Sequence, residues 1–294
     1  MHWILASKII ITVAILFLAS RADWKTREAS DIFWIVLGIF GMIFLITQIY
    51  LDEVNSAYYL ILFPIAVFFL DIFWDRDGFF ENGVNLTPLV LYIGAFVSLA
   101  WLVSKYHSDL YLWKLLLIPI LFFLFIILYQ FDIIKGGADA KALIALTIMF
   151  PMYPQGYGFP LIGAAVNMKD FILPFPVLIL FNAAILTLIV PITMFILNIL
   201  RKDIEFPTMF LGYRMFIDDI QNKHVWPMES VVDGRIKVEL FPQNSCDITD
   251  QVNELRMMGA DSIWVTPKIP FLIPITISVL MSIFVGNLLF LIIQ

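Results

Sequence analysis

Two segments of the chain combine an aspartate with small or basic neighbours in a way that suits proton-transfer chemistry. They are residues 21–28, which contain Asp23, and residues 135–141, which contain Asp139. Two carboxylates held close together cannot both ionise, so they share one proton near neutral pH. One member can then act as a base while the other donates a hydrogen bond. Asp23 and Asp139 are therefore the leading candidates for a catalytic pair.

Each aspartate alone also has a simpler explanation. Asp23 fits an ordinary carboxylate in a solvated charged loop, and Asp139 fits an N-cap ahead of helix-forming residues. The preceding Gly136 and Gly137 fit a simple turn. In an active site they would instead let a substrate backbone approach closely and would tolerate unusual dihedral angles.

Other polar residues are weaker candidates. Asp71, Asp75 and Asp77 share an acidic loop, and Asp132 stands at the end of an apolar run, where interfacial solvation explains it. The chain has three scattered histidines and a single cysteine, which form no metal-binding pattern: His2, His107, His224 and Cys246. We therefore expect no metal and no cofactor.

The elements that must position these residues are apolar helices. The chain of 294 residues is 61% hydrophobic and 14% charged, with mean hydropathy +0.92. Soluble domains are about 45–50% apolar and about 25% charged, so this composition excludes a soluble globular protein and a disordered one. A net charge of −6 argues against a nucleic-acid partner.

Eight segments are long and apolar enough to cross a lipid bilayer as helices, and their continuous character differs from the alternation of a membrane barrel. They are 3–20, 32–50, 57–73, 87–103, 112–131, 140–155, 172–200 and 268–293. Most lysines and arginines fall on the inner side when the N-terminus lies outside. The sequence predicts a multi-pass protein of the cell membrane, with both aspartates at the cytoplasmic face.

The fold class expected is an all-α polytopic membrane protein with a small α/β cytoplasmic insertion. Three regions are predicted: 1–200 as a membrane-embedded catalytic domain, 201–267 as the insertion, and 268–294 as a last transmembrane helix. Within the insertion, residues 235–241 and 262–266 read as strands. Residues 249–258 read as a helix, with Thr249 as its N-cap and Gly259 as its C-cap.

The two aspartate segments together resemble motifs of the type 4 prepilin peptidases, specifically the archaeal preflagellin peptidase branch of the GxGD-type membrane aspartic proteases. Asp23–Arg27 matches that family's Asp-x-Lys-x-Arg segment after the first span. Gly136–Asp139, followed by Lys141, matches its Gly-x-Gly-Asp motif, and 263–270 resembles the entry to its last span.

Two features depart from the family pattern. Ala138 replaces the second glycine of the motif. The expected eight spans also exceed the six of preflagellin peptidases, and the extra pair is 57–73 and 87–103. Paired C-x-x-C motifs, which the methylating prepilin peptidases carry, are missing because Cys246 stands alone.

The resemblance implies an aspartic endopeptidase, without methyltransferase activity, that removes short basic leaders (class III signal peptides) from prepilin-like or prearchaellin precursors. It implies Asp23 and Asp139 as the catalytic residues. Lys25, Arg27 and Lys141 would either tune the pair or meet lipid headgroups, and the second role suits the first two better. The alternatives are a proton-coupled transporter with intramembrane carboxylates and a non-enzymatic scaffold.

Overall fold

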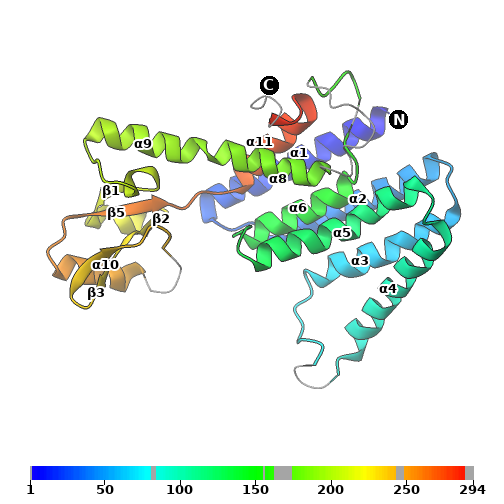
Figure 1. Ribbon diagram of the computed structural model, residues 1–294, viewed down its shortest axis with the longest axis horizontal. Helices are drawn as coiled ribbons and strands as arrows, with labels where there is room; N and C mark the ends of the chain where they lie inside the picture. Colours follow the sequence, from blue (N-terminus) through cyan, green and yellow to red (C-terminus); the bar gives the residue numbers. More distant parts are fainter. Residues whose placement is uncertain (1, 81–83, 155, 162–173, 243–247, 289–294) are drawn as a thin grey trace. The chain divides into compact units, whose positions relative to one another are not determined.

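The computed structural model describes residues 2–80, 84–154, 156–161, 174–242 and 248–288. The chain forms two compact units (Figure 1). One contains Met1–Ala184 together with Pro270–Gln294, and the other contains Ile185–Ile269. Cys246 lies outside the described residues, as do the first residues of the expected span 172–200 and the last residues of 268–293.

The first unit is helical, as its long apolar runs predict. Its described helices are α1 (His2–Thr26), α2 (Asp31–Leu51), the 3-10 helix η1 (Ser56–Ile61), α3 (Leu62–Asp71), α4 (Leu86–Tyr106), α5 (Leu110–Gln130), α6 (Gly137–Met149), α8 (Phe175–Thr187) and α11 (Leu272–Phe284). Polar residues set several of the helix starts. Ser30 accepts a hydrogen bond from the Ile32 N–H at 3.4 Å, and Asp109 accepts one from the Tyr111 N–H at 2.9 Å.

Five described helices are long and apolar enough to cross a membrane, so the expected count of eight is not reached. They are Trp3–Thr26, Asp31–Leu51, Leu86–Tyr106, Leu110–Gln130 and Phe175–Arg201. The other three expected spans do contain helices, but these are shorter. The segment 57–73 is divided between η1 and α3, α6 ends ahead of Pro151, and α11 has 13 residues.

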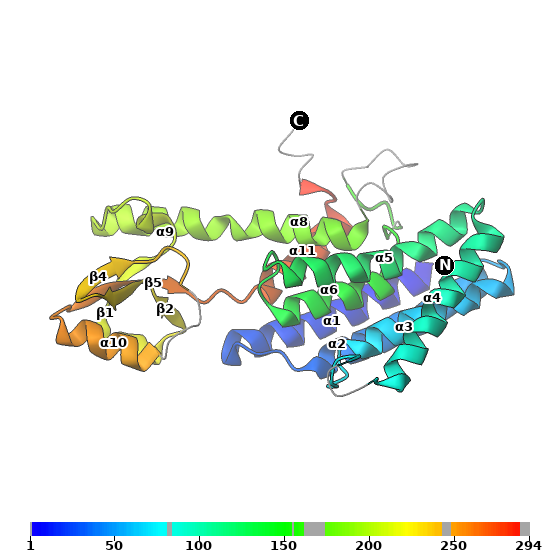
Figure 2. The ribbon, with the colours of Figure 1, turned by 60° about the horizontal axis from the view of Figure 1, so that its bottom comes forward.

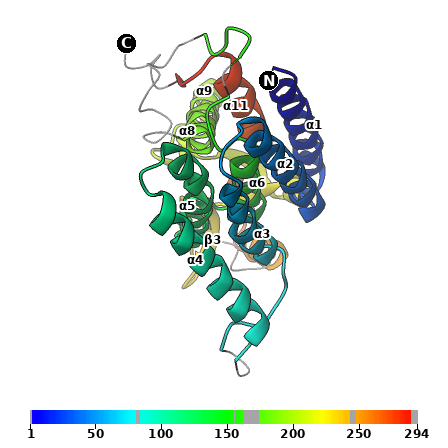
Figure 3. The same cartoon turned by 90° about the vertical axis from the view of Figure 1, so that its right-hand side faces the viewer.

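Helix α6 lies inside the helical unit. Figure 3 shows it among its neighbours, and it packs against α1, α2, α5 and α11. All of its residues from Asp139 to Met149 are buried except Lys141. A helix that is apolar on every side is stable only when it is surrounded. Such a helix needs no bilayer-spanning length, which explains why 13 residues suffice.

Close approach of α2 to α6 depends on Gly41. A Cβ atom on Gly41 would lie 3.0 Å from both the Ile148 Cγ2 and the Met149 backbone nitrogen. On the other side of the unit, α3 and α4 pack against each other and against α5, side by side in Figure 2. These two helices come from the segments expected as the extra pair.

The second unit contains the expected small α/β region. Its described elements are α9 (Ile189–Arg201), η2 (Thr208–Phe210), β1 (Tyr213–Phe216), η3 (Ile217–Asn222), β2 (Val225–Pro227), β3 (Glu229–Val232), β4 (Arg235–Val238), α10 (Ile248–Met257) and β5 (Ser262–Pro267). The antiparallel strands β1, β5 and β2 form one sheet in that order, and β3 pairs with β4. Asn198, fully buried at the end of α9, donates to the carbonyl oxygens of Met209 and Gly212 at 2.8 and 2.7 Å.

The predicted elements of this unit are confirmed with small shifts. The strand expected at 235–241 is the shorter β4, and the strand expected at 262–266 is β5. Thr249 lies inside α10 rather than capping it. Gly259 ends α10 with φ of +80°, and the Ala260 N–H bonds to the Leu255 carbonyl, as in a Schellman cap.

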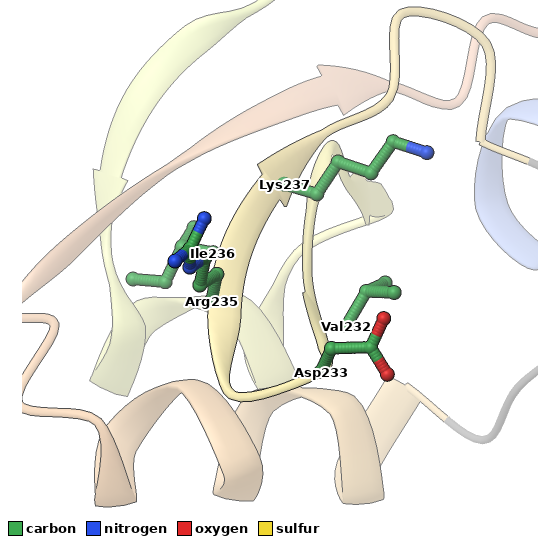
Figure 4. A pocket seen from close by; sticks show the side chains of 5 residues that line it. All are labelled: Val232, Asp233, Arg235, Ile236 and Lys237. Carbon is green, nitrogen blue, oxygen red and sulfur yellow. The ribbon is translucent and has the colours of Figure 1, made fainter.

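The β3–β4 hairpin turns through Asp233 and Gly234, both with positive φ, as in the favoured two-residue hairpin turns. Figure 4 shows side chains along this hairpin that line an open depression. Arg235, Ile236 and Lys237 contribute to it from β4. Neither Asp23 nor Asp139 lines this depression, so it is separate from the candidate site.

Candidate active site

Asp139 lies in the first turn of α6 and is 8% exposed. It is not the N-cap, because α6 begins at Gly137 and Gly136 occupies the cap position. The Asp139 N–H bonds to the Gly136 carbonyl at 3.1 Å. Its carboxylate is therefore held by the start of a buried helix.

Gly136 leaves room for the Asp139 carboxylate. A Cβ atom at position 136 would lie 2.1 Å from the Asp139 Oδ2, which no real structure tolerates. A Cβ at Gly137 would lie 3.4 Å from the Tyr129 hydroxyl oxygen, an ordinary contact. The expectation of unusual dihedral angles is not met, since neither glycine has a positive φ. Space for a side chain is the reason for the first glycine.

Asp23 occupies the last turn of α1 and is partly buried. Burial is the largest influence on its carboxylate and disfavours the charged form, and two groups act in the opposite direction. The backbone N–H of Leu272, the first residue of α11, hydrogen-bonds to it, and the positive charge of Arg27 lies close enough to interact with it. The end of α1 and the start of α11 therefore meet at this carboxylate, although they come from opposite ends of the chain.

The structure brings Asp23 and Asp139 into electrostatic contact across α1 and α6. Burial raises the pKa of the Asp139 carboxyl, and the negative charge of Asp23 raises it further, to about 7. A carboxyl with this pKa keeps its proton through much of the neutral range. The pKa of Asp139 is thus raised in the direction expected when a second carboxylate lies nearby.

The basic residues near the pair differ in their surroundings. Lys141 forms an ion pair of 2.6 Å with Asp31 at the start of α2, and its ammonium lies 5.2 Å from the centre of the Phe73 ring. Arg27 lies over the Trp24 ring at 5.6 Å, and its guanidinium atoms Nε and one Nη are buried without a hydrogen-bond partner.

These surroundings refine the roles expected from sequence. Lys25 is exposed, as the expectation of headgroup contact requires. Arg27 acts on Asp23 instead of only facing outward. Asp31 and Leu272 were missed by sequence reasoning. The only signal for Asp31 was an acidic residue after a capping serine, and a backbone N–H such as that of Leu272 has no signature in sequence.

The rival aspartates have structural partners or lie exposed. Both carboxylate oxygens of Asp71 are engaged, one by Arg76 at 2.7 Å and the other by the Tyr92 hydroxyl at 2.7 Å. Asp75, Asp77 and Asp132 are exposed. Within the described part of the chain, no three histidine, cysteine, aspartate or glutamate side chains form a group that could hold a metal ion.

Five helices long and apolar enough to span a membrane, together with two neighbouring carboxylates, are typical of a helical membrane protein with a polar site inside it. Residues 205–288 match the family model described as Archaeal Peptidase A24 C-terminus Type II. The match covers most of the second unit and all of α11.

Three curated relatives are preflagellin peptidases. The chain is 25% identical over 279 residues to that of Methanocaldococcus jannaschii, covering 92% of this chain and 91% of the relative. It is 24% identical over 277 residues to that of Methanococcus maripaludis, covering 92% of each. It is 28% identical over 160 residues to that of Methanococcus voltae, covering 52% of this chain and 64% of the relative. The predicted resemblance to the archaeal preflagellin peptidases is therefore confirmed over nearly the whole chain.

Proposed function

We propose that this chain is a membrane aspartic endopeptidase that cleaves short basic leaders, the class III signal peptides, from prearchaellin or prepilin-like precursors. Similarity to preflagellin peptidases over 92% of the chain supports the substrate class. The interaction between Asp23 and Asp139 is the single observation that supports the catalytic type.

The surroundings of the two carboxylates support different roles for them. Asp139 is the more deeply buried and has a pKa raised to about 7, which suits the member that carries the shared proton. Asp23 faces the Leu272 N–H and the Arg27 charge, both of which stabilise an anion. Asp23 is accordingly the base and Asp139 the acid at the start of the reaction.

The reaction follows from these protonation states. The Asp23 carboxylate takes a proton from a water molecule, whose oxygen forms a bond to the scissile carbonyl carbon. The Asp139 carboxyl donates its proton to the carbonyl oxygen as negative charge develops there. The C–N bond then breaks, the leaving nitrogen takes the proton held by Asp23, and Asp139 recovers a proton from the new carboxyl group.

The proposal also covers the topology of the chain in the membrane and its regions. The enzyme is a multi-pass protein of the cell membrane with its N-terminus outside, and the site acts at the cytoplasmic face. Residues 1–200 form the membrane-embedded catalytic domain, 201–267 the soluble cytoplasmic domain, and 268–294 the last transmembrane segment. Gly136, Gly137 and Ala138 shape the site. The enzyme needs no cofactor and does not methylate its product.

A cleavage assay tests this proposal. The purified full-length chain in lipid nanodiscs is mixed with a preflagellin that carries its leader, and the products are read by mass spectrometry. We expect one cut after the leader, at the same rate with and without EDTA. An intact precursor in the presence of folded protein would contradict the proposal. Proton flux by the same protein in liposomes would then favour the transporter.

A further inference from the structure

A cluster of two hydroxyl groups joins α1 to α11 one turn away from Asp23. Ser20 is 7% exposed, and its Oγ lies 3.0 Å from the Leu272 carbonyl oxygen and 2.7 Å from the Thr276 Oγ1. Thr276 Oγ1 also lies 2.8 Å from the Leu272 carbonyl oxygen and 3.4 Å from that of Leu16. The cluster therefore links both helices through side chain and backbone.

The spacing of these residues explains why they meet. Ser20 precedes Asp23 by three residues on α1, so both side chains emerge on the same face of the helix. Leu272 and Thr276 are separated by four residues on α11 and are likewise stacked on one face. The hydroxyl cluster therefore donates a hydrogen bond to the Leu272 carbonyl oxygen, and the N–H of the same residue hydrogen-bonds to the Asp23 carboxylate.

The start of α11 has no side-chain cap of its own. Phe271 occupies its N-cap position and provides no side-chain hydrogen bond, although the Ile273 N–H bonds to the Pro270 carbonyl at 3.3 Å. Asp23 on α1 supplies an acceptor for the Leu272 N–H from a different helix. The partial positive charge of the helix start in turn stabilises the carboxylate anion.

We propose that Ser20 and Thr276 are positioning residues, which hold the first turn of α11 so that the Leu272 N–H keeps the Asp23 carboxylate oriented and ionised. This inference rests on the proposed function, in which Asp23 is the base. The hydroxyl groups touch neither substrate nor water in the reaction and act through the Leu272 backbone.

The charged and polar groups that face Asp23 determine how a weaker bond to the Leu272 N–H would change its protonation. Arg27 faces it from α1, Asp139 faces it from α6, and α11 offers the Leu272 N–H. Weakening the contact from α11 removes a donor that favours the Asp23 anion, while burial continues to disfavour that anion. The base then gains its proton at a higher pH, so the acid limb of the activity profile moves upward.

Substitution of Thr276 tests the inference in the full-length enzyme. Thr276→Val keeps the shape of the side chain and removes its hydroxyl, whereas Thr276→Ser keeps the hydroxyl. Thr47→Val is the matched control, because the Thr47 hydroxyl bonds to the Ile43 carbonyl of its own helix, at 2.8 Å. Cleavage of a leader-bearing precursor is measured as kcat and KM across a range of pH.

We expect Thr276→Val to lower kcat about two- to tenfold, as for the loss of one hydrogen bond, with little change in KM. Its acid limb should lie at higher pH, and Thr276→Ser and Thr47→Val should match the wild type. A wild-type kcat and pH profile for Thr276→Val would overturn the inference, and so would a Thr276→Ser variant as impaired as Thr276→Val. If Thr276→Val does not fold, Ser20→Ala supplies the same comparison. Ser104→Ala is its control, because the exposed Ser104 hydroxyl bonds to the Trp101 carbonyl of its own helix at 2.8 Å.

Failure of this inference can be told apart from failure of the proposed function. If Asp23→Asn is inactive while Thr276→Val and Ser20→Ala behave as wild type, the hydroxyl cluster does not position the base. If Asp23→Asn itself cleaves at the normal rate, the proposed catalytic pair is wrong and the positioning role falls with it.

Discussion

At the scale of single residues, Gly136 and Gly137 differ in the space that their neighbours leave for a side chain. Gly136→Ala would place a methyl group 2.1 Å from the present position of the Asp139 Oδ2 and would force the carboxylate to move. Gly137→Ala adds only an ordinary contact with Tyr129. We expect Gly136→Ala to lower kcat at least about tenfold and Gly137→Ala to change it less than about twofold, since misplaced catalytic groups are costly. Steady-state cleavage kinetics on both variants check this, and equal effects would contradict it.

The raised pKa of Asp139 has a consequence for stability. Its pKa rises from 3.8 to about 7 on folding, so the folded protein binds this proton more tightly than the unfolded chain does. The stability it provides is complete below pH 3.8 and is lost as the pH rises through about 7. The change is on the order of 4 kcal/mol, since the pKa moves from 3.8 to about 7 and one pKa unit corresponds to about 1.4 kcal/mol.

Asp139→Asn should remove this dependence. Thermal unfolding of the detergent-solubilised protein, followed by tryptophan fluorescence, should show wild type losing stability between about pH 4 and about pH 7. The Asp139→Asn variant should show a flatter profile and a higher Tm at the upper pH. Asp132→Asn is the control, because Asp132 is exposed. An Asp139→Asn profile parallel to the wild type would show that Asp139 ionises normally.

At the scale of helices, the contact between α2 and α6 is set by Gly41. A leucine there would push against the backbone of Ile148 and Met149, which cannot move aside as a side chain can. We expect Gly41→Leu to destabilise the protein by about 1–3 kcal/mol, the usual cost of overpacking. Denaturation in detergent measures the effect.

A matched control lies two residues further along the same helix. Ile43 is 51% exposed, so Ile43→Phe adds bulk into open space and should leave stability nearly unchanged. Equal stabilities for the two variants would show that α2 and α6 are not in close contact at Gly41. Loss of stability in Gly41→Leu alone supports the packing described here.

The positions of helices could be predicted from the sequence, but their lengths could not. Each of the eight apolar segments contains helix, because continuous apolar runs have few other stable solutions. The number of long helices is smaller than the number of expected spans, because Pro151 follows the end of α6 and the 57–73 segment begins as a 3-10 helix. An apolar run surrounded by protein looks the same in sequence as one surrounded by lipid.

The proximity of Asp23 and Asp139 was predictable to a similar extent. Asp23 and Asp139 came from their motifs, and the structure brings them together. The partners that orient them could not be predicted from the motifs. The Asp31–Lys141 ion pair and the Leu272 N–H depend on how distant helices pack. Sequence reasoning also attributed Gly136 to backbone freedom, whereas the structure shows that the missing side chain matters.

At the scale of the whole molecule, the second unit has more acidic than basic side chains. Residues 201–266 contain 11 acidic and 7 basic side chains. Asp218 is paired with Arg256, Asp247 lies outside the described residues, and Asp219 and Asp250 are exposed. Such an excess of negative charge attracts a basic leader over about 8 Å at physiological ionic strength and raises its encounter rate.

Neutralising part of this charge tests recruitment. The double variant Asp219→Asn/Asp250→Asn should raise KM for a basic leader about two- to fivefold at low ionic strength, with kcat unchanged. The difference should shrink in high salt. Asp219→Glu/Asp250→Glu keeps the charge and should behave as wild type. Equal KM values for wild type and the neutral variant would mean that these carboxylates only keep the unit soluble.

In the proposed mechanism two aspartates, one from α1 and one from α6, together cleave the leader. The most direct measurement is cleavage of a leader-bearing precursor by Asp23→Asn and by Asp139→Asn, each in nanodiscs and each shown to be folded. An amide fills the same space but can neither act as the base nor share the proton. We predict that each substitution lowers kcat at least about a thousandfold, within the range that removal of a catalytic group produces. Near-normal cleavage by either variant would contradict the account.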